Sequence, residues 1–284
     1  MTVFRYETPT TLKQRADYDR LTELLSKMYI KEHLQMRIDE IVVQNSGHTN
    51  EDGNAELKLD RGPSYSQTMC DPNIRMAAWV SCGLSIFQQL SGINAIMFYS
   101  STLFGSSTSG GLTGNQQTAI INTVNMVSVL GGAVMMNRYG RRGMMITWTA
   151  VCALSMFLVG FAQGQITDNP GSSFGLMKLI CSLVFVASFE FAPGPIPWLY
   201  MGEVVNDKGM TIAVFLNWLF TLIIGTVTTP WSNATPAGIF YTFGLFNLAA
   251  VVFYLIWMKE TKGLSQEQVK MLYVKNRYAG NDEL

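Results

Sequence analysis

Residues 88–100 read QQLSGINAIMFYS and lie inside a stretch, 76–104, that contains no charged residue. A helix of about 20 mostly apolar residues crosses the core of a bilayer, so this stretch is long enough to span a membrane. Its middle nevertheless contains Gln88, Gln89 and Asn94. Because polar groups in hydrocarbon need hydrogen-bond partners, these three amides are expected to face protein or water rather than lipid.

The charges of the chain lie mostly in its two ends. The chain has 284 residues, 48% hydrophobic and 14% charged, and its formal net charge of zero gives no indication of a nucleic-acid partner. Of its 20 basic and 20 acidic residues, only nine lie within 76–258: Arg138, Arg141, Arg142, Asp168, Lys178, Glu190, Glu203, Asp207 and Lys208. This distribution predicts an all-α membrane protein with polar ends.

The apolar region between these ends divides into a series of transmembrane spans. Six spans are predicted, at 76–104, 116–136, 143–163, 174–202, 209–230 and 236–258. The connections at 137–142 (NRYGRR) and 202–209 (GEVVNDKG) carry more charge than the others. Short loops rich in Lys and Arg stay on the cytoplasmic side, so these connections and both chain termini are predicted to be cytosolic.

The polar ends have their own expected organisation. Residues 1–75 are predicted to form a cytosolic helical region and linker, because 13–45 place apolar residues at helical spacing among many charges. Residues 259–284 are predicted to be a cytosolic tail. The four cysteines form no CxxC pair and both histidines lie in the N-terminal region, so no metal site or other cofactor is expected.

A second apolar span is interrupted by proline. Residues 188–203 read SFEFAPGPIPWLYMGE and place three prolines within 193–197. Pro removes a backbone donor, and irregular backbone is tolerated at membrane depth only where it is buried in protein or lines a cavity. The helix is therefore predicted to break near its centre, with Glu190 before the break and Trp198 after it. An intramembrane carboxylate indicates a functional site, and an aromatic face beside amides suits a neutral ligand rich in hydroxyl groups.

Taken alone, the amides of 88–100 fit two interpretations. They line a binding cavity, or they form hydrogen bonds between helices. The cavity requires a local unwinding at Ser91 and Gly92, because an unbroken helix at 100° per residue points Gln88 and Asn94 in different directions. The proline break favours the cavity, although Trp198 by itself is equally compatible with packing or with an interfacial anchor.

Ordered motifs across nearly the whole chain resemble those of the sugar porters of the major facilitator superfamily. QQLSGINAIMFYS resembles the signature of their seventh transmembrane helix, and 189–203 (FEFAPGPIPWLYMGE) resembles that of their tenth. NRYGRR is similar to the loop between their eighth and ninth helices, ETKGLS at 260–265 to the motif after their twelfth, and YETP at 6–9 to a weaker form of the motif after their sixth. The resemblance covers the C-terminal half of a twelve-helix transporter. It implies the C-terminal six-helix bundle of that fold and transport of a monosaccharide, a hexose such as glucose, by alternating access.

The resemblance also implies a set of sugar-binding and gating residues. The sugar would contact Gln88, Gln89, Asn94, Asn122, Glu190 and Trp198. An outer lid would be formed by Phe98 and Tyr99, and the flexible point of a gating helix by Gly194, Pro195 and Pro197. Asn125, one turn after Asn122, is expected to make a packing hydrogen bond.

Charge pairs at the cytosolic helix ends, which favour the outward-facing state, are a further implication of the resemblance. The sequence departs from the family pattern here, because Asn137 replaces an acidic residue and the connection after Glu203 is shorter and lacks an arginine. A weaker latch is therefore expected, with Lys208 as a substitute partner. The residues of this latch would be Arg138, Arg141, Arg142, Glu203 and Glu260.

Three interpretations of a half-length chain remain open. It is a fragment of a longer transporter, it forms a homodimer that rebuilds a twelve-helix pore, or it is a non-transporting protein that associates with a full-length transporter and regulates it. The expected partners are a sugar, the lipid bilayer of the plasma membrane, and an N-terminal six-helix half or a second copy. An enzyme is not expected, because no nucleophile, base and orienting group occur together near the membrane.

Overall fold

The computed structural model describes Arg20, Glu23, Leu24 and residues 63–105, 112–168 and 174–274. The chain divides into two units, Met1–Gly62 and Pro63–Leu284. The cytosolic helices predicted within 13–45 lie, apart from the three single residues, outside the described residues. The second unit begins before residue 75, because the short helix that follows Pro63 packs against the bundle.

Helices form the described part of the second unit, in agreement with the all-α class predicted from the sequence. In chain order they are α4 (Tyr65–Cys70), α5 (Arg75–Leu90), α6 (Ile93–Gly105), α7 (Gly114–Arg138), α8 (Arg141–Asp168), α9 (Phe174–Phe191), α10 (Ile196–Val204), α11 (Asp207–Ala234), α12 (Gly238–Trp257) and α13 (Gln266–Met271). Two of the long helices begin at residues that suit a helix N-terminus. Thr113 and Gln116 form a capping box at α7, and the Asn206 side chain accepts a hydrogen bond from Gly209 N at α11.

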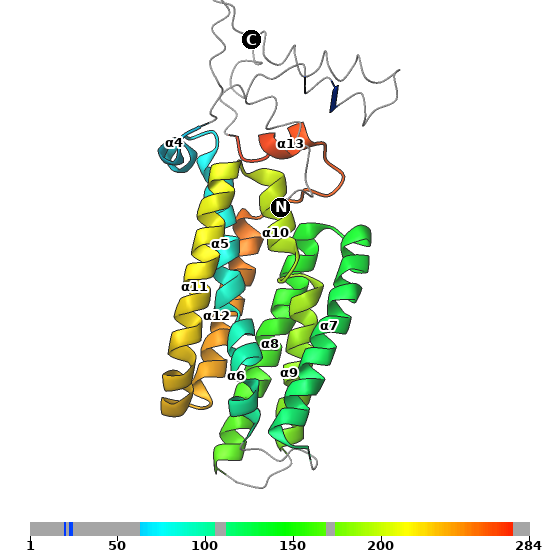
Figure 1. Ribbon diagram of the computed structural model, residues 1–284, viewed down its shortest axis with the longest axis vertical. Helices are drawn as coiled ribbons and strands as arrows, with labels where there is room; N and C mark the ends of the chain where they lie inside the picture. Colours follow the sequence, from blue (N-terminus) through cyan, green and yellow to red (C-terminus); the bar gives the residue numbers. More distant parts are fainter. Residues whose placement is uncertain (1–19, 21–22, 25–62, 106–111, 169–173, 275–284) are drawn as a thin grey trace, which may run out of the picture. The chain divides into compact units, whose positions relative to one another are not determined.

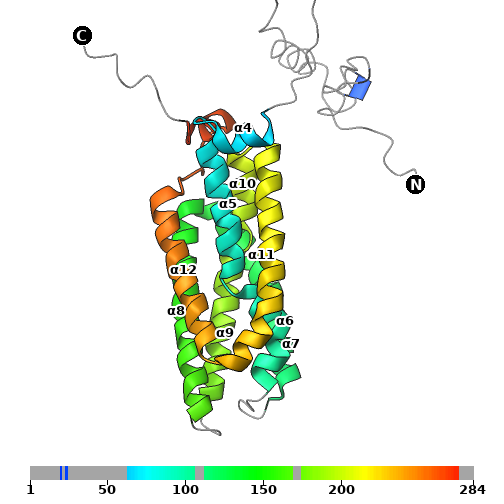
Figure 2. The same cartoon turned by 90° about the vertical axis from the view of Figure 1, so that its left-hand side faces the viewer.

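The long helices of this unit run along one another as a bundle (Figure 1). α8 packs against both α9 and α12, α5 packs against α11, and α7 packs against α9. α12 and α8 lie side by side in the view turned by 90° (Figure 2). α4 and α13 lie at the same end of the bundle as α10 and the start of α8. We call this end the charged end, because Arg141, Glu203 and Glu260 meet there.

Among the residues that the structure describes, five helical segments are long and apolar enough to cross a membrane. They are Gly114–Arg138, Arg141–Asp168, Phe174–Val204, Asp207–Ala234 and Gly238–Trp257. The predicted first span, 76–104, consists of α5 followed by α6, which are 16 and 13 residues long. Each of these two helices is too short to count as a span alone. End to end, they cover the length that the sequence assigned to one broken transmembrane helix.

Two apolar clusters fill the bundle. The cluster nearer the charged end includes Leu84, Met145 and Tyr200, and the other includes Ile96 and Phe185. Because lipid is as apolar as these side chains, their burial stabilises the bundle through close packing more than through removal from water.

Burial differs strongly between the helices of the bundle. Half of the most apolar stretch of α8 is buried inside the bundle. Only 17% of the corresponding stretch is buried in α7 and in α11. Met126 and Leu130 on α7, and Trp218 and Leu222 on α11, are all more than 60% exposed. These faces are free within the described part of the chain to contact lipid or another helical bundle.

A glycine allows α7 to approach the end of α9 closely. A Cβ atom added to Gly132 would lie 2.3 Å from the Glu190 carbonyl oxygen and 3.2 Å from the Phe191 Cα atom. Both neighbours are backbone atoms, so neither can move aside as a flexible side chain would. Gly143 on α8 offers a contrast, because a Cβ atom there would meet nothing within 4 Å.

We predict that Gly132→Ala destabilises the bundle by about 1–3 kcal/mol, because the added methyl group must push α7 away from α9. Gly143→Ala serves as the matched control and is expected to be neutral or slightly stabilising, since Ala favours helix more than Gly does. The measurement is the thermal unfolding midpoint of each variant, purified in detergent, from tryptophan fluorescence. Equal midpoints for the two variants would show that the approach at Gly132 is not tight.

Candidate functional site

Two adjacent glutamines in the last turn of α5 contact different parts of the bundle. Gln88 is 5% exposed, and its Nε2 atom donates hydrogen bonds to the Pro193 carbonyl oxygen (3.0 Å) and the Gly194 carbonyl oxygen (2.7 Å). Its Oε1 atom accepts a hydrogen bond from Asn217 Nδ2 at 2.7 Å. Gln88 therefore joins α5 to the segment between α9 and α10 and to α11.

A chain of amides continues from Asn217. The Oδ1 atom of Asn217 accepts from Gln89 Nε2 at 2.9 Å, and Gln89 Oε1 accepts from Asn94 Nδ2. We call the series Gln88, Asn217, Gln89 and Asn94 the amide chain. It brings together three of the side chains that the sequence placed in a binding site, with Asn217 linking them.

The break between α5 and α6 makes this convergence possible. Gly92 has φ +92°, a conformation that side chains other than glycine's rarely adopt, and a Cβ atom there would lie 2.6 Å from the Phe243 ring. Ser91 Oγ donates to the Gln88 carbonyl oxygen at 2.7 Å, and Asn247 Nδ2 of α12 donates to the Ser91 carbonyl oxygen at 3.0 Å. The unwinding predicted at Ser91 and Gly92 is present, and side chains satisfy the carbonyls that it frees.

The break between α9 and α10 follows from the prolines. Pro193 has no N–H for the Phe189 carbonyl oxygen, which accepts instead from Gly194 N at 2.8 Å. Pro197 likewise has no N–H to offer the Pro193 carbonyl oxygen four residues earlier. α9 therefore ends at Phe191, and α10 begins at Ile196.

Glu190 lies at the end of α9, directly before this break. It is partly buried, and Asn125 Nδ2 of α7 donates a hydrogen bond to its Oε1 atom at 2.7 Å. Its Oε2 atom lies over the break, 3.2 Å from the position a Cβ atom would take on Gly194. Asn125 thus makes the non-ligand hydrogen bond that the sequence suggested, and its partner is the intramembrane carboxylate.

The other residues expected at the site are less enclosed. Trp198 is partly buried in the first turn of α10. Asn122 is exposed, and its side-chain amide makes no hydrogen bond with the described part of the chain. Phe98 is 60% exposed, and the side chain of Tyr99 lies outside the described residues. The structure therefore describes no outer lid formed by both aromatic residues.

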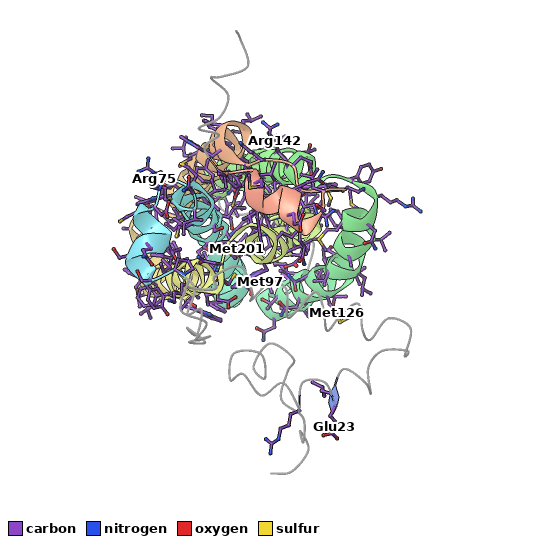
Figure 3. The ribbon with its side chains drawn as sticks, turned by 90° about the horizontal axis from the view of Figure 1, so that it is seen from above. Glu23, Arg75, Met97, Met126, Arg142 and Met201 are labelled. Atoms are coloured by element: carbon purple, nitrogen blue, oxygen red, sulfur yellow. The ribbon has the colours of Figure 1, made fainter. Side chains whose placement is uncertain are left out.

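Seen from above, the bundle has labelled methionines both in its interior and on its exposed side (Figure 3). Met97 and Met201 lie toward its middle, whereas Met126 lies on α7 at its periphery. Met201 belongs to the interior near the site, because its sulfur accepts a hydrogen bond from Ser85 Oγ of α5 at 3.2 Å. Asn122 precedes Met126 by one helical turn and shares its side of α7.

Glu260 binds the backbone at the charged end. Its two carboxylate oxygens accept hydrogen bonds from Arg141 N (2.8 Å) and Arg142 N (3.1 Å), the first two residues of α8. A carboxylate in this position caps the N-terminus of α8 and complements the helix dipole. The latch residue Glu260 therefore contacts peptide N–H groups where the sequence suggested a pair between side chains.

The charge pair of the latch is incomplete within the described residues. Arg141 Nη2 and Glu203 Oε1 are 3.2 Å apart, whereas Glu203 Oε2 is buried without a hydrogen-bond partner there. Arg142 Nη2 donates to the Leu255 carbonyl oxygen at 2.7 Å. Arg138 is exposed and has no ion pair among the residues that the structure describes.

A tyrosine pair fixes the end of α13 against α10 at the same end of the bundle. The hydroxyl groups of Tyr200 and Tyr273 are 2.6 Å apart, and Lys259 N donates to both. Burial is the largest influence on Tyr273 and raises its pKa. Its hydroxyl group therefore stays neutral and can donate to the Trp257 carbonyl oxygen at 3.0 Å.

The second unit is thus a bundle of long apolar helices that contains two helix breaks. Amide side chains donate hydrogen bonds to the carbonyl oxygens at both breaks. A sequence model of the family described as "Sugar (and other) transporter" matches residues 1–273. The chain belongs to this family. As a membrane protein of the sugar transporter family it is not an enzyme, which agrees with the expectation from the sequence.

Insect trehalose transporters are among the curated relatives of this sugar transporter family member. The facilitated trehalose transporter Tret1 of Apis mellifera ligustica is 32% identical over 209 residues, which are 71% of this chain and 40% of that protein. Trehalose transporter 1 of Drosophila melanogaster is 32% identical over 200 residues, 67% of this chain and 23% of that protein. The chain therefore spans less than half the length of these relatives.

Solved structures show the fold. The major facilitator superfamily proton:xylose symporter XylE bound to 6-bromo-6-deoxy-D-glucose gives a TM-score of 0.71 at 23% identity, over 94% of this chain and 54% of that chain. The inward open conformation of XylE from E. coli gives 0.62 at 22% identity, over 94% of this chain and 52% of that one. The bundle is thus about half of a major facilitator fold.

Four polar residues inside the bundle of this sugar transporter family member make contacts whose partners the sequence did not indicate. Asn217 links the amide chain, Asn125 orients Glu190, and Asn247 caps the α5–α6 break. Lys178 is fully buried, with its Nζ atom 5.9 Å from the centre of the Phe240 ring. The signal available for each was a lone polar residue in an apolar helix, which identifies a buried hydrogen bond but not its partner.

We predict that Asn125 and Glu190 are energetically coupled. A hydrogen bond to a charged group contributes about 1.5–3 kcal/mol, and Asn125→Ala would leave the partly buried carboxylate without its donor. A double-mutant cycle with Glu190→Ala, followed by equilibrium unfolding in detergent, is expected to give a coupling energy of about 1 kcal/mol or more. Thr123→Ala is the control on α7, since Thr123 Oγ1 donates to the Ala119 carbonyl oxygen of its own helix. If the coupling energy with Glu190→Ala is no larger for Asn125→Ala than for Thr123→Ala, the prediction that Asn125 and Glu190 are coupled is wrong.

Proposed function

We propose that the chain forms one six-helix half of a sugar transporter and supplies one wall of a monosaccharide site. The activity would be transmembrane movement of the sugar by alternating access, in which two six-helix halves rock about a site near the middle of the membrane. The observation that carries the proposal is the amide chain between two helix breaks.

The chemistry of this region supports a neutral ligand that is rich in hydroxyl groups. The amide chain contains neutral donors and acceptors, and the Pro193 and Gly194 carbonyls can only accept. A hydroxyl group can both donate and accept, so adjacent hydroxyl groups of a sugar can pair with both kinds of atom. Anions are disfavoured beside Glu190 and the two carbonyls, because these groups offer them no donor.

Six residues are assigned to the sugar in this proposal. Hydrogen bonds would come from the amides and from the carboxylate before the α9–α10 break, and the indole face would lie against the C–H face of the ring. These residues are Gln88, Gln89, Asn94, Asn122, Glu190 and Trp198. Phe98 and Tyr99 are proposed to cover the site, and Gly194, Pro195 and Pro197 to let α10 bend relative to α9.

The bundle is proposed to lie in the plasma membrane, with its charged end facing the cytosol. Arg138, Arg141 and Arg142 belong to a short connection, and such basic connections stay on the cytoplasmic side. The pair between Arg141 and Glu203 and the cap that Glu260 forms on α8 would hold the cytosolic ends of the helices together. In a transporter, these contacts would favour the state that is open to the outside.

A second bundle is required to close the proposed site. The exposed faces of α7 and α11 would contact an N-terminal six-helix half or a second copy of this chain. A chain that fails to transport with either partner would instead associate with a full-length transporter and regulate it. The proposed substrate is a hexose such as glucose. Trehalose and xylose, the sugars in the names of the relatives and of the structural neighbour, are the competing sugars to test.

We predict glucose uptake when the chain is fused to the N-terminal half of a sugar porter and expressed in cells that lack hexose carriers. Uptake of radiolabelled glucose by the chain alone would indicate that two copies rebuild the pore. Competition by unlabelled xylose and trehalose ranks the three sugars. No uptake of any sugar by the fusion, although it reaches the cell surface, would refute the transport proposal and favour a regulatory role.

We also predict that Asn94→Ala in this fusion raises the glucose concentration for half-maximal uptake about tenfold, because one hydrogen bond in a dry site contributes roughly 1.4 kcal/mol. Gln163→Ala is the matched control, since Gln163 lies on α8 and its amide donates to Thr167 of the same helix. A half-maximal concentration that stays unchanged in Asn94→Ala would return Asn94 to a packing role.

A further inference from the structure

The α9–α10 break exposes carbonyl oxygens that the helix itself cannot pair. In an unbroken helix the Pro193 carbonyl oxygen would accept from the N–H of residue 197, but that residue is Pro197. A buried carbonyl without a donor is costly at membrane depth. The break therefore requires donors from another element of the bundle.

Gln88 supplies these donors from α5. Its Nε2 atom lies 3.0 Å from the Pro193 carbonyl oxygen and 2.7 Å from the Gly194 carbonyl oxygen, so both amide hydrogens are directed at the break. The orientation of the amide is fixed chemically, because two carbonyl oxygens can only accept. On its other side, Gln88 Oε1 accepts from Asn217 Nδ2.

The same residue belongs to the other broken helix. The Gln88 carbonyl oxygen accepts from Ser91 Oγ at 2.7 Å, at the point where α5 gives way to α6. The side chain of Gln88 thus contacts one break, and its main chain contacts the other. A movement of α10 relative to α9 that separates Pro193 and Gly194 from α5 must break the hydrogen bonds of Gln88.

We propose that Gln88 is a positioning residue that holds the α9–α10 break in this conformation, and that a sugar releases the break by taking over the Gln88 amide. The second part rests on the sugar-binding function proposed above. A sugar oxygen would accept from Gln88 Nε2, and two neighbouring hydroxyl groups would donate to the Pro193 and Gly194 carbonyl oxygens that Gln88 has left. Each hydrogen bond that is lost is then replaced, and α10 is free to change its angle to α9.

This exchange specifies the chemistry of the ligand. It must present an acceptor and two donors on neighbouring atoms, as the vicinal hydroxyl groups of a sugar do. A ligand with acceptors alone would take the Gln88 amide but leave the Pro193 and Gly194 carbonyls unpaired. The structure therefore assigns to Gln88 a role in coupling ligand chemistry to the bend of α10, in addition to any contribution to affinity.

Hydrogen–deuterium exchange of the full chain in detergent tests the positioning role without transport. Gln88→Met keeps the length of the side chain but removes its donors, and peptides covering 189–204 report on the break. Exchange of these peptides is expected to be roughly tenfold faster than in the native chain, while peptides of α8 stay unchanged. Gln89→Met is the matched control, because Gln89 donates to Asn217 and not to the break. Equal exchange at the break in the two variants would overturn the proposal.

A second variant covers the case in which Gln88→Met does not fold. Gln88→Glu keeps the shape of the side chain and the acceptor for Asn217, but an ionised carboxylate cannot donate to the two carbonyls. It is therefore expected to speed exchange in the same peptides. Native exchange in Gln88→Glu at a pH where the carboxylate is ionised would refute the positioning role.

Addition of D-glucose to the fusion with a sugar-porter N-terminal half, in which the proposed site is closed, tests the switch, with L-glucose as the control sugar. In the fusion that carries the native sequence, D-glucose is expected to speed exchange across the break, and in the fusion that carries Gln88→Met it should add nothing further. If Gln88→Met speeds exchange but the fusion that carries the native sequence does not respond to D-glucose, the switch is refuted and the positioning role stands. Failure of the fusion to take up glucose would refute the proposed transport separately.

Discussion

The need to pair every backbone polar group at membrane depth organises this bundle. Straight transmembrane helices meet that need internally, but α5–α6 and α9–α10 are broken and leave carbonyls outside any helical ladder. Asn247 donates to the Ser91 carbonyl at one break, and Gln88 donates to the Pro193 and Gly194 carbonyls at the other. Amides therefore occur where the helices break, because an amide side chain can replace the missing backbone donor and still accept a hydrogen bond from a neighbour.

This arrangement has an energetic consequence for binding. The polar atoms of Gln88 and Gln89 already have partners inside the chain, so a ligand exchanges hydrogen bonds and does not add them to unpaired groups. Such an exchange contributes little net free energy, because each new bond replaces an existing one. Weak net binding would suit the proposed transport, in which the ligand must be released on the other side of the membrane. Specificity then depends on whether the ligand can replace every bond that it removes.

Sequence patterns predicted the helices and breaks well, and the contacts between helices poorly. The absence of charge between 76 and 137 and the prolines at 193–197 are local properties, and both breaks lie where they were expected. The partner of a buried amide is not local. Gln88 and Asn217 are 129 residues apart in sequence, and no pattern in either segment indicates that α5 packs against α11. The capping role of Glu260 was also not predicted, although α8 begins after Tyr139-Gly140 with no Ser, Thr, Asp or Asn to cap it. At α8 the acceptor that is missing locally is supplied by Glu260, 119 residues after Arg141 in the sequence.

The open side of the bundle bears on whether a second half is present. Asn122, Met126 and Leu130 follow one another at helical spacing on α7, and all three are exposed. A face in contact with lipid alone would place the Asn122 amide in hydrocarbon without a partner, which costs a few kcal/mol. Against a second bundle, the same amide would meet water in a central cavity or a polar group across the interface, and the flanking apolar side chains would pack. The position of Asn122 therefore supports the proposal that a protein partner packs on this side of α7.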